Sequence, residues 1–124
     1  MARILIIDDE KPVRDALEAI AAVSGHEVRC AADGRQGLAE YLTFKPDVVV
    51  TDMLMPEKEG IETIIELRKL QPGLPIIAMS GGGRVGNMSF LTMAERFGAT
   101  RTLSKPFSAA EMAAALASCL TASP

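Results

Sequence analysis

Short apolar runs alternate along the chain with stretches in which apolar residues recur every three or four positions. The runs at 3–7, 48–51 and 75–79 are almost wholly apolar, which is typical of strands buried on both faces of a parallel sheet. Two shorter segments, at 27–31 and 101–104, are also strand-like. The hydrophobic pattern therefore predicts five strands.

The intervals between these strands carry helical spacing, and local signals mark where several helices begin and end. Asp33 with Gln36, and Ser108 with Glu111, have the spacing of helix-capping boxes. The expected helices run from Pro12 to near Gly25 and over 34–44, 60–70, 87–97 and 109–120. Five strands alternating with five helices predict an α/β fold, a doubly wound, flavodoxin-like parallel sheet with strand order 2-1-3-4-5.

Composition narrows the class of protein. A chain of 124 residues, 48% hydrophobic and 23% charged, is expected to form one globular domain over 1–124. No apolar run approaches the roughly 20 residues that span a bilayer, and the amino terminus does not read as a signal peptide, so a cytoplasmic protein without membrane insertion is expected. Two distant cysteines and one histidine argue against a disulfide framework or a zinc site. The net charge of −3, without a basic cluster, argues against direct nucleic-acid binding.

Polar residues follow the apolar strands where each strand ends. Asp8 and Asp9 follow the first, Asp52 the third, Ser80 the fourth and Lys105 the fifth. In an open parallel sheet ligands bind beyond the carboxyl ends of the strands, so these residues are expected to converge. Carboxylates this close cannot all stay ionised unaided, so either the pKa of one rises or a cation is recruited, and oxygen ligands suit Mg²⁺. The Ser80 hydroxyl and the Lys105 ammonium would then bind an anion such as a phosphoryl group.

Each residue taken alone has an ordinary explanation. Asp8 and Asp9 could cap the first helix, Asp52 could be a turn residue, and Lys105 could be a surface charge at a strand end. Their occurrence at matching strand ends favours the metal site.

Five segments of the sequence resemble a known family. They are "ILIIDDE", "PDVVVTDMLMPEKEG" around Asp52, the Ser80 position, "FGA" at 97–99, and "SKPF" at 104–107. In this order and near this spacing, the chain resembles the receiver domain of two-component response regulators, in particular single-domain chemotaxis regulators, over essentially its whole length.

The resemblance implies a phosphoacceptor switch with Mg²⁺ as cofactor rather than a conventional enzyme, with only weak self-phosphotransfer and autodephosphorylation. Its implied partners are a sensor histidine kinase or a histidine phosphotransfer protein, and an unknown downstream protein. A monomer or a weak phosphorylation-dependent dimer is expected. The peptide bond before Pro106 is expected to be cis. The implied site residues are Asp52 as phosphoacceptor, Lys105 and Ser80 as its catalytic partners, and Asp8 (through water), Asp9, Asp52 and the backbone carbonyl of Leu54 as metal ligands.

Two features depart from the family pattern. Thr102 stands where many receiver domains carry an aromatic residue, three positions before Lys105. The interval from Ser80 to Lys105 (105 − 80 = 25 positions) is longer than usual, with the excess in the glycine-rich residues 81–86. We therefore expect the conformational output to run through this loop and the following helix. The glycines do not indicate dinucleotide binding, because they follow the fourth strand rather than the first.

Two other functions stay open from the sequence. One is a small Mg²⁺-dependent phosphohydrolase with Asp52 as nucleophile, although Leu54 stands where a second acidic residue would be expected. The other is the receiver part of a longer regulator that carries an output domain.

Overall fold

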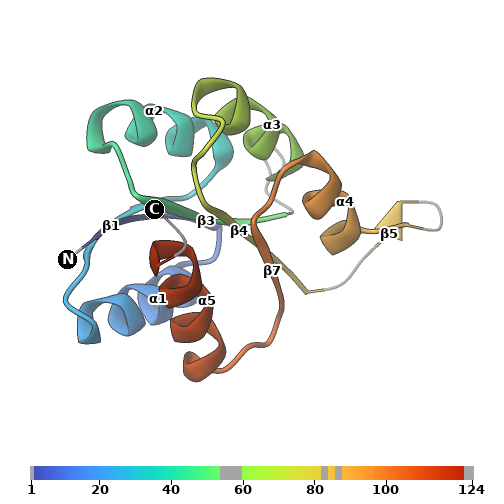
Figure 1. Cartoon of the computed structure of the whole chain (residues 1–124). Coiled ribbons are helices and arrows are strands. Elements are labelled where there is room, and N and C mark those ends of the chain that lie inside the picture. The colour runs from blue at the N-terminus through green and yellow to red at the C-terminus, as the bar shows by residue number, and fades with distance from the viewer. Residues whose placement is uncertain (1, 54–59, 82–83, 86–87, 122–124) are drawn as a thin grey trace.

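The central feature is one parallel sheet of five strands (Figure 1). The computed structural model describes residues 2–53, 60–81, 84–85 and 88–121. The strands are ordered β2-β1-β3-β4-β7, and every neighbouring pair is parallel. This confirms the predicted order 2-1-3-4-5. The strand bounds are β1 (Arg3–Ile7), β2 (Glu27–Ala31), β3 (Val48–Asp52), β4 (Ile76–Ser80) and β7 (Arg101–Ser104).

Helices cover both faces of the sheet. Figure 1 shows α1 and α5 on one face and α2, α3 and α4 on the other. Among the described residues, no helix is long and apolar enough to span a membrane. The helix bounds are α1 (Lys11–Val23), α2 (Gly34–Phe44), α3 (Gly60–Leu70), α4 (Phe90–Phe97) and α5 (Ala109–Thr121).

The all-apolar strands supply two cores, one on each face of the sheet. Every residue of β3 and β4 is buried. Along β3 the side chains alternate: Val48 and Val50 pack with α1 and α5, whereas Val49 packs with α2, α3 and α4. Complete burial of an aliphatic side chain contributes about 1.5–3 kcal/mol. The continuous hydrophobic runs therefore fix the middle of the sheet, and with it the strand ends that carry the polar residues.

The predicted N-cap at Asp33 and the predicted capping box of Ser108 with Glu111 are both confirmed. The Asp33 carboxylate accepts from the Gln36 amide at 2.8 Å, and the Gln36 side chain accepts from the Ala32 amide at 3.0 Å. Before α5, the Ser108 hydroxyl accepts from the Glu111 amide at 3.0 Å, while the Glu111 carboxylate accepts from the Ser108 amide at 2.9 Å. The Gln36 and Glu111 amides are among those that the first helical turn leaves unsatisfied.

The segment between β4 and α4 differs from expectation. We predicted a glycine-rich loop followed by a helix from residue 87, but α4 begins only at Phe90. The Ser89 hydroxyl accepts from the Thr92 amide at 3.2 Å, so Ser89 is the N-cap that sets this boundary. The preceding residues form a short antiparallel hairpin, β5 (Arg84–Val85) with β6 (Met88–Ser89), which projects away from the main sheet in Figure 1.

Arg68, near the end of α3, hydrogen-bonds to the turn after α3 and to the residue after α4. Its guanidinium donates to the carbonyl oxygens of Pro72 at 2.6 Å and Leu74 at 2.7 Å, and to that of Gly98 directly after α4. Burial lowers the pKa of this guanidinium. Gly98, with a φ of +121°, ends α4 as predicted. The carboxyl end of α4 is thus fixed to the turn that leads into β4.

Candidate functional site

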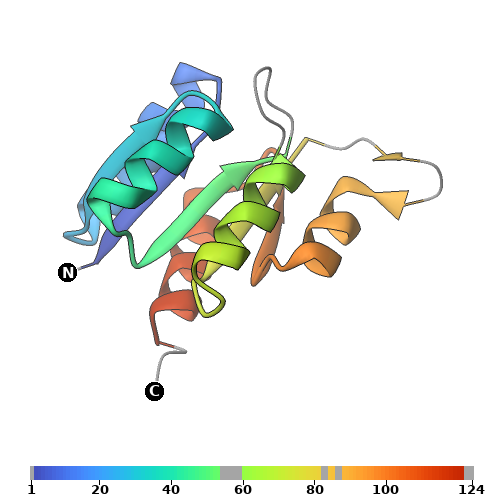
Figure 2. The ribbon, with the colours of Figure 1, turned by 90° about the horizontal axis from the view of Figure 1, so that it is seen from above.

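The polar residues predicted from the strand ends meet at one edge of the sheet. Figure 2 shows the strands running in the same direction, so their carboxyl ends share an edge. Asp8 follows β1, Asp52 ends β3 and Ser80 ends β4. In the strand register Asp52 lies opposite Met79, and Ser80 lies opposite Ser104, the residue before Lys105. The predicted convergence is confirmed by these neighbours.

Lys105 is the cation at the centre of the site. Its Nζ lies 2.8 Å from Asp8 Oδ2 and 3.1 Å from Asp52 Oδ1, and its side chain is only 17% exposed. The Lys105 amide donates to the Ser80 carbonyl at 2.7 Å, which fixes the start of the side chain at the sheet edge. Burial by itself lowers the pKa of Lys105, but its hydrogen bonds to Asp8 and Asp52 outweigh burial and raise it. The ammonium therefore stays charged at neutral pH.

Asp8 is completely buried and uses both carboxylate oxygens. Oδ2 accepts from Lys105, while Oδ1 accepts from the Glu10 amide at 2.9 Å. Its backbone is also held, because the Arg14 guanidinium donates to the Asp8 carbonyl at 2.7 Å. Glu10, rather than Asp8 or Asp9, occupies the N-cap position of α1, and its side chain makes no capping bond. The structure therefore does not support helix capping as the role of the two aspartates.

Asp52 ends β3 and is largely shielded from solvent, with only 6% of the residue exposed. Burial raises its pKa above the ordinary aspartate value; Lys105 opposes this shift by hydrogen bonding and charge, and Asp8 adds to it. The carboxylate thus lies beside its counter-ion in a setting that disfavours its charge. A buried, partly neutralised carboxylate facing an ammonium has the arrangement of a nucleophile that accepts an anionic group.

Gly60 lies directly against the backbone of Asp52, and sequence reasoning missed it. Its amide donates to the Met53 carbonyl at 3.1 Å. A Cβ atom at position 60 would collide with the Asp52 carbonyl oxygen and the Met53 Cα, both of which are backbone atoms that cannot rotate away. The only available signal was a glycine at the predicted start of a helix. Gly60 lets α3 begin close to the end of β3.

A group of acidic side chains lies beside Lys105. Asp8, Asp9 and Glu10 offer carboxylate oxygens within 4.8 Å of one another. Of the predicted metal ligands, Asp8 and Asp9 belong to this group, and Asp52 is linked to it through Lys105. Leu54 lies outside the described residues. Glu10 was not predicted, although its position next to Asp8 and Asp9 in the sequence could have indicated it.

The remaining predicted positions lie beside the site. Ser80 is buried at the end of β4. Thr102 is half-buried in β7, opposite Ala78 of β4. The peptide bond between Lys105 and Pro106 is cis, as the family resemblance implied.

Comparison with known proteins agrees with this geometry. The sequence pattern of the response regulator receiver domain matches residues 4–117. The chain belongs to the response regulator receiver domain family. This receiver domain is 36% identical over 115 residues to chemotaxis protein CheY of Thermotoga maritima, covering 92% of this chain and 93% of that protein. It is 38% identical over 110 residues to regulatory protein AtoC of Escherichia coli, covering 89% of this chain but 23% of AtoC.

Solved structures show the same fold. A receiver domain from Clostridium thermocellum superposes with a TM-score of 0.89 at 30% identity, covering 98% of this chain and 96% of the other. A CheY-like receiver domain from Methanospirillum hungatei gives a TM-score of 0.90 at 26% identity, covering 98% and 95%. Receiver domains are signalling switches of two-component systems, so this one implies a histidine kinase or phosphotransfer partner and a downstream target.

Proposed function

We propose that this receiver domain, spanning residues 1–124, is a cytoplasmic phosphoacceptor switch. Asp52 takes a phosphoryl group from a histidine kinase or a phosphotransfer protein, and the modified domain changes its binding to an output partner. The observation that carries this proposal is the Lys105 ammonium, 3.1 Å from Asp52 Oδ1 and held in place by the buried Asp8. It supplies the positive charge that a transferred phosphoryl group requires.

The bonds that form and break in the proposed transfer involve only the Asp52 carboxylate and a phosphodonor. A carboxylate oxygen attacks phosphorus, a new P–O bond forms, and the donor's bond to phosphorus breaks with its electron pair leaving on the donor. Asp52 becomes an acyl phosphate, and Lys105 neutralises charge on the phosphoryl oxygens. Attack by water on the acyl phosphate later releases inorganic phosphate and restores the carboxylate.

The acidic residues fit the divalent cation that the family uses. Asp8, Asp9 and Asp52 offer hard oxygen donors at one edge of the sheet, and Mg²⁺ prefers such ligands while retaining several waters. Asp8 already accepts from Lys105 and from a backbone amide, which suits a contact through water. When bound, the ion adds positive charge next to the phosphoryl group. The proposed ligand set also includes the Leu54 carbonyl, on the resemblance alone.

Ser80 is the proposed switch residue. Its hydroxyl is carried at the end of β4, in the strand next to Asp52, and its carbonyl accepts from the Lys105 amide at 2.7 Å. A phosphoryl group on Asp52 would offer this hydroxyl a charged acceptor and thereby draw the start of the β4–α4 connection towards the site.

A second candidate is a receiver domain that acts within a longer regulator. It is favoured by relatives of different architecture: the chain spans nearly all of the Thermotoga CheY but 47% of response regulator MprA of Mycolicibacterium vanbaalenii and 23% of AtoC. In that case the output partner would be a domain of the same protein.

The test is phosphorylation by a small donor with Mg²⁺, followed by intact-mass measurement. Asp52→Asn is expected to abolish the gain of one phosphoryl group. The matched control is Asp47→Asn, which changes a carboxylate just before the opposite end of β3 that accepts from the Arg3 amide at 2.8 Å. Phosphorylation of Asp52→Asn at the wild-type rate would refute the assignment.

A further inference from the structure

Glu10 is a third counter-ion of Lys105. Its Oε1 lies 3.6 Å from the ammonium, compared with 2.8 Å for Asp8 and 3.1 Å for Asp52. The two aspartates are buried, whereas the Glu10 side chain is 62% exposed. One ammonium is therefore shared among two interior carboxylates and one at the surface.

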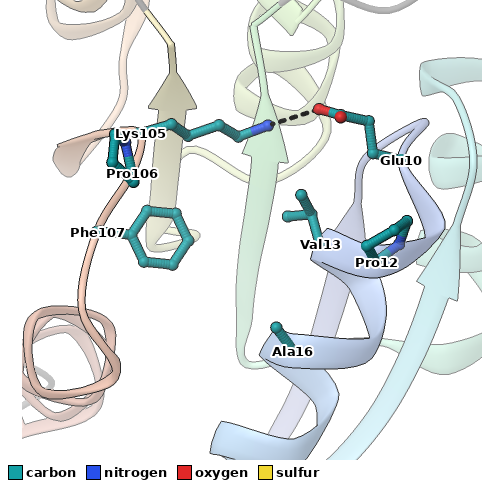
Figure 3. A pocket seen from close by; sticks show the side chains of 7 residues that line it. All are labelled: Glu10, Pro12, Val13, Ala16, Lys105, Pro106 and Phe107. Atoms are coloured by element: carbon teal, nitrogen blue, oxygen red, sulfur yellow. Dashed lines mark ion pairs between the residues drawn. The ribbon is translucent and has the colours of Figure 1, made fainter.

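Figure 3 shows where this third carboxylate lies. Glu10 and Lys105 point towards each other from the start of α1 and the end of β7, across a groove of about 460 Å³. The other lining residues are all apolar: Pro12, Val13, Ala16, Pro106 and Phe107. An apolar wall screens a neighbouring charge less than water does. The Glu10 charge therefore acts on a charged molecule that approaches Lys105 more strongly than an ordinary surface carboxylate would.

The Glu10 charge is also close to the reacting carboxylate. Glu10 Oε1 and Asp52 Oδ1 contact the same nitrogen, at 3.6 and 3.1 Å, so they lie within about 7 Å of each other, inside the Debye length of about 10 Å at 0.1 M salt. A phosphodonor that approaches Asp52 brings negative charge to this place. Its repulsion by Glu10 grows with the donor's own charge.

We propose that Glu10 is a specificity-determining residue that selects phosphodonors by charge. Its carboxylate disfavours dianionic donors such as acyl phosphates relative to donors of lower charge such as those with a P–N bond. A protein phosphohistidine also has a P–N bond, and its phosphorylated ring carries a net single negative charge when the imidazole is protonated. This inference deepens the proposed function and rests on it. Glu10 would thereby make the switch respond to protein donors rather than to small metabolic phosphates.

The test compares two small donors on a charge series at position 10. Acetyl phosphate is a dianion near neutral pH, and phosphoramidate carries a net single negative charge. Initial phosphorylation rates are measured by intact mass for wild type, Glu10→Gln and Glu10→Lys, each at an Mg²⁺ concentration shown to saturate it. Asp15→Asn is the matched control, because Asp15 is an exposed carboxylate of α1 that pairs with Lys11.

At low ionic strength, Glu10→Gln is expected to speed phosphorylation by acetyl phosphate about threefold, and Glu10→Lys further. The gain with phosphoramidate is expected to be clearly smaller, and both gains should vanish near 0.5 M salt, where the Debye length is only about 4 Å. Asp15→Asn is expected to behave as wild type with both donors. A residue with a merely structural role would not produce rates that follow charge, donor and salt in this way.

Two outcomes are distinguishable. If wild type is phosphorylated but Glu10→Gln leaves the acetyl phosphate rate unchanged, or speeds both donors equally at all salt concentrations, the role of Glu10 is overturned and the proposed function stands. If wild type takes a phosphoryl group from neither donor, the proposed function fails and this inference fails with it.

Discussion

Replacing Lys105 with methionine measures how much the Lys105 charge contributes to the stability of the domain. Methionine keeps an unbranched apolar side chain and removes the ammonium, so packing changes little. What changes is the surroundings of the two buried carboxylates, which lose a cation at 2.8 Å (Asp8) and 3.1 Å (Asp52). No other Lys or Arg side chain is within 4.0 Å of either carboxylate among the ion pairs of the described residues.

The expected loss of unfolding free energy follows from burial. Removing one partner of a buried ion pair costs about 3–5 kcal/mol, because the other charge stays in a medium that solvates it poorly. Asp8 is fully buried and Asp52 is 6% exposed, but the Lys105 side chain retains 17% exposure. The lower end of that range, about 3 kcal/mol, is therefore expected at neutral pH.

The loss should depend on pH in a defined direction. Burial and Asp8 already raise the pKa of Asp52, and removing Lys105 removes the opposing contribution, so the pKa rises further. A carboxyl group with a raised folded-state pKa destabilises the protein above that pKa, and the penalty disappears as pH falls towards the unfolded value of about 4. The deficit of Lys105→Met should therefore be largest at neutral and alkaline pH and shrink on acidification.

Urea denaturation at several pH values measures this. Lys11→Met is the control: Lys11 also has an N–O distance of 2.8 Å to its partner, Asp15, but the two side chains are 74% and 61% exposed. An exposed pair of this kind contributes less than about 1 kcal/mol. Equal losses for the two variants, or a Lys105→Met deficit that stays constant between neutral and acidic pH, would refute the reasoning.

Three further variants test single features of the structure. Gly60→Ala should destabilise the domain by about 1–3 kcal/mol in urea unfolding and slow phosphorylation, because a Cβ atom forces the Asp52 backbone to move. The control is Gly73→Ala, which should be nearly neutral because a Cβ atom there meets nothing within 4 Å. A neutral Gly60→Ala would contradict the close approach. Arg68→Met should cost about 2–3 kcal/mol, because the partly buried carbonyl groups of Leu74 and Gly98 lose a charged donor. No difference from Lys69→Met would show that the bonds contribute nothing. Asp52→Asn should raise the melting temperature above the Asp52 pKa, where wild type keeps a disfavoured charge, and the gain should fall away on acidification. A lower melting temperature for Asp52→Asn at neutral pH would contradict that interpretation.

Much of the fold was predictable because its signals are local and agree with one another. Continuous apolar runs specify strands buried on both faces, and the capping boxes at Asp33 and Ser108 mark helix starts within the chain itself. Once the strands were known to be parallel, the convergence of Asp8, Asp52 and Lys105 followed from topology. These predictions required no knowledge of side-chain packing.

The features that sequence reasoning missed depend on distances between separate segments. The hairpin of β5 and β6 has only two residues in each strand, too few for a hydrophobic alternation to be seen. Because β6 occupies residues 88 and 89, α4 begins at Phe90 rather than at the predicted residue 87. Gly60 and Arg68 are significant only because of the backbone atoms that lie beside them. Glu10 resembles any exposed glutamate at the start of a helix until its distance to Lys105 is known.

The same charge imbalance links stability with the proposed chemistry. Within the site, Asp8, Glu10 and Asp52 all lie within 4.0 Å of Lys105, the one ammonium that contacts them among the described residues, and Asp9 adds a further carboxylate beside Asp8 and Glu10. A site designed only for stability would match its charges or replace them with apolar side chains. Under the proposed function, the excess of negative charge would attract a divalent cation, and the cation would offset the negative charge of an incoming phosphoryl group. On this proposal the raised pKa of Asp52 has a functional explanation: the sheet edge gives up some stability in order to hold a cation and a phosphoryl group together.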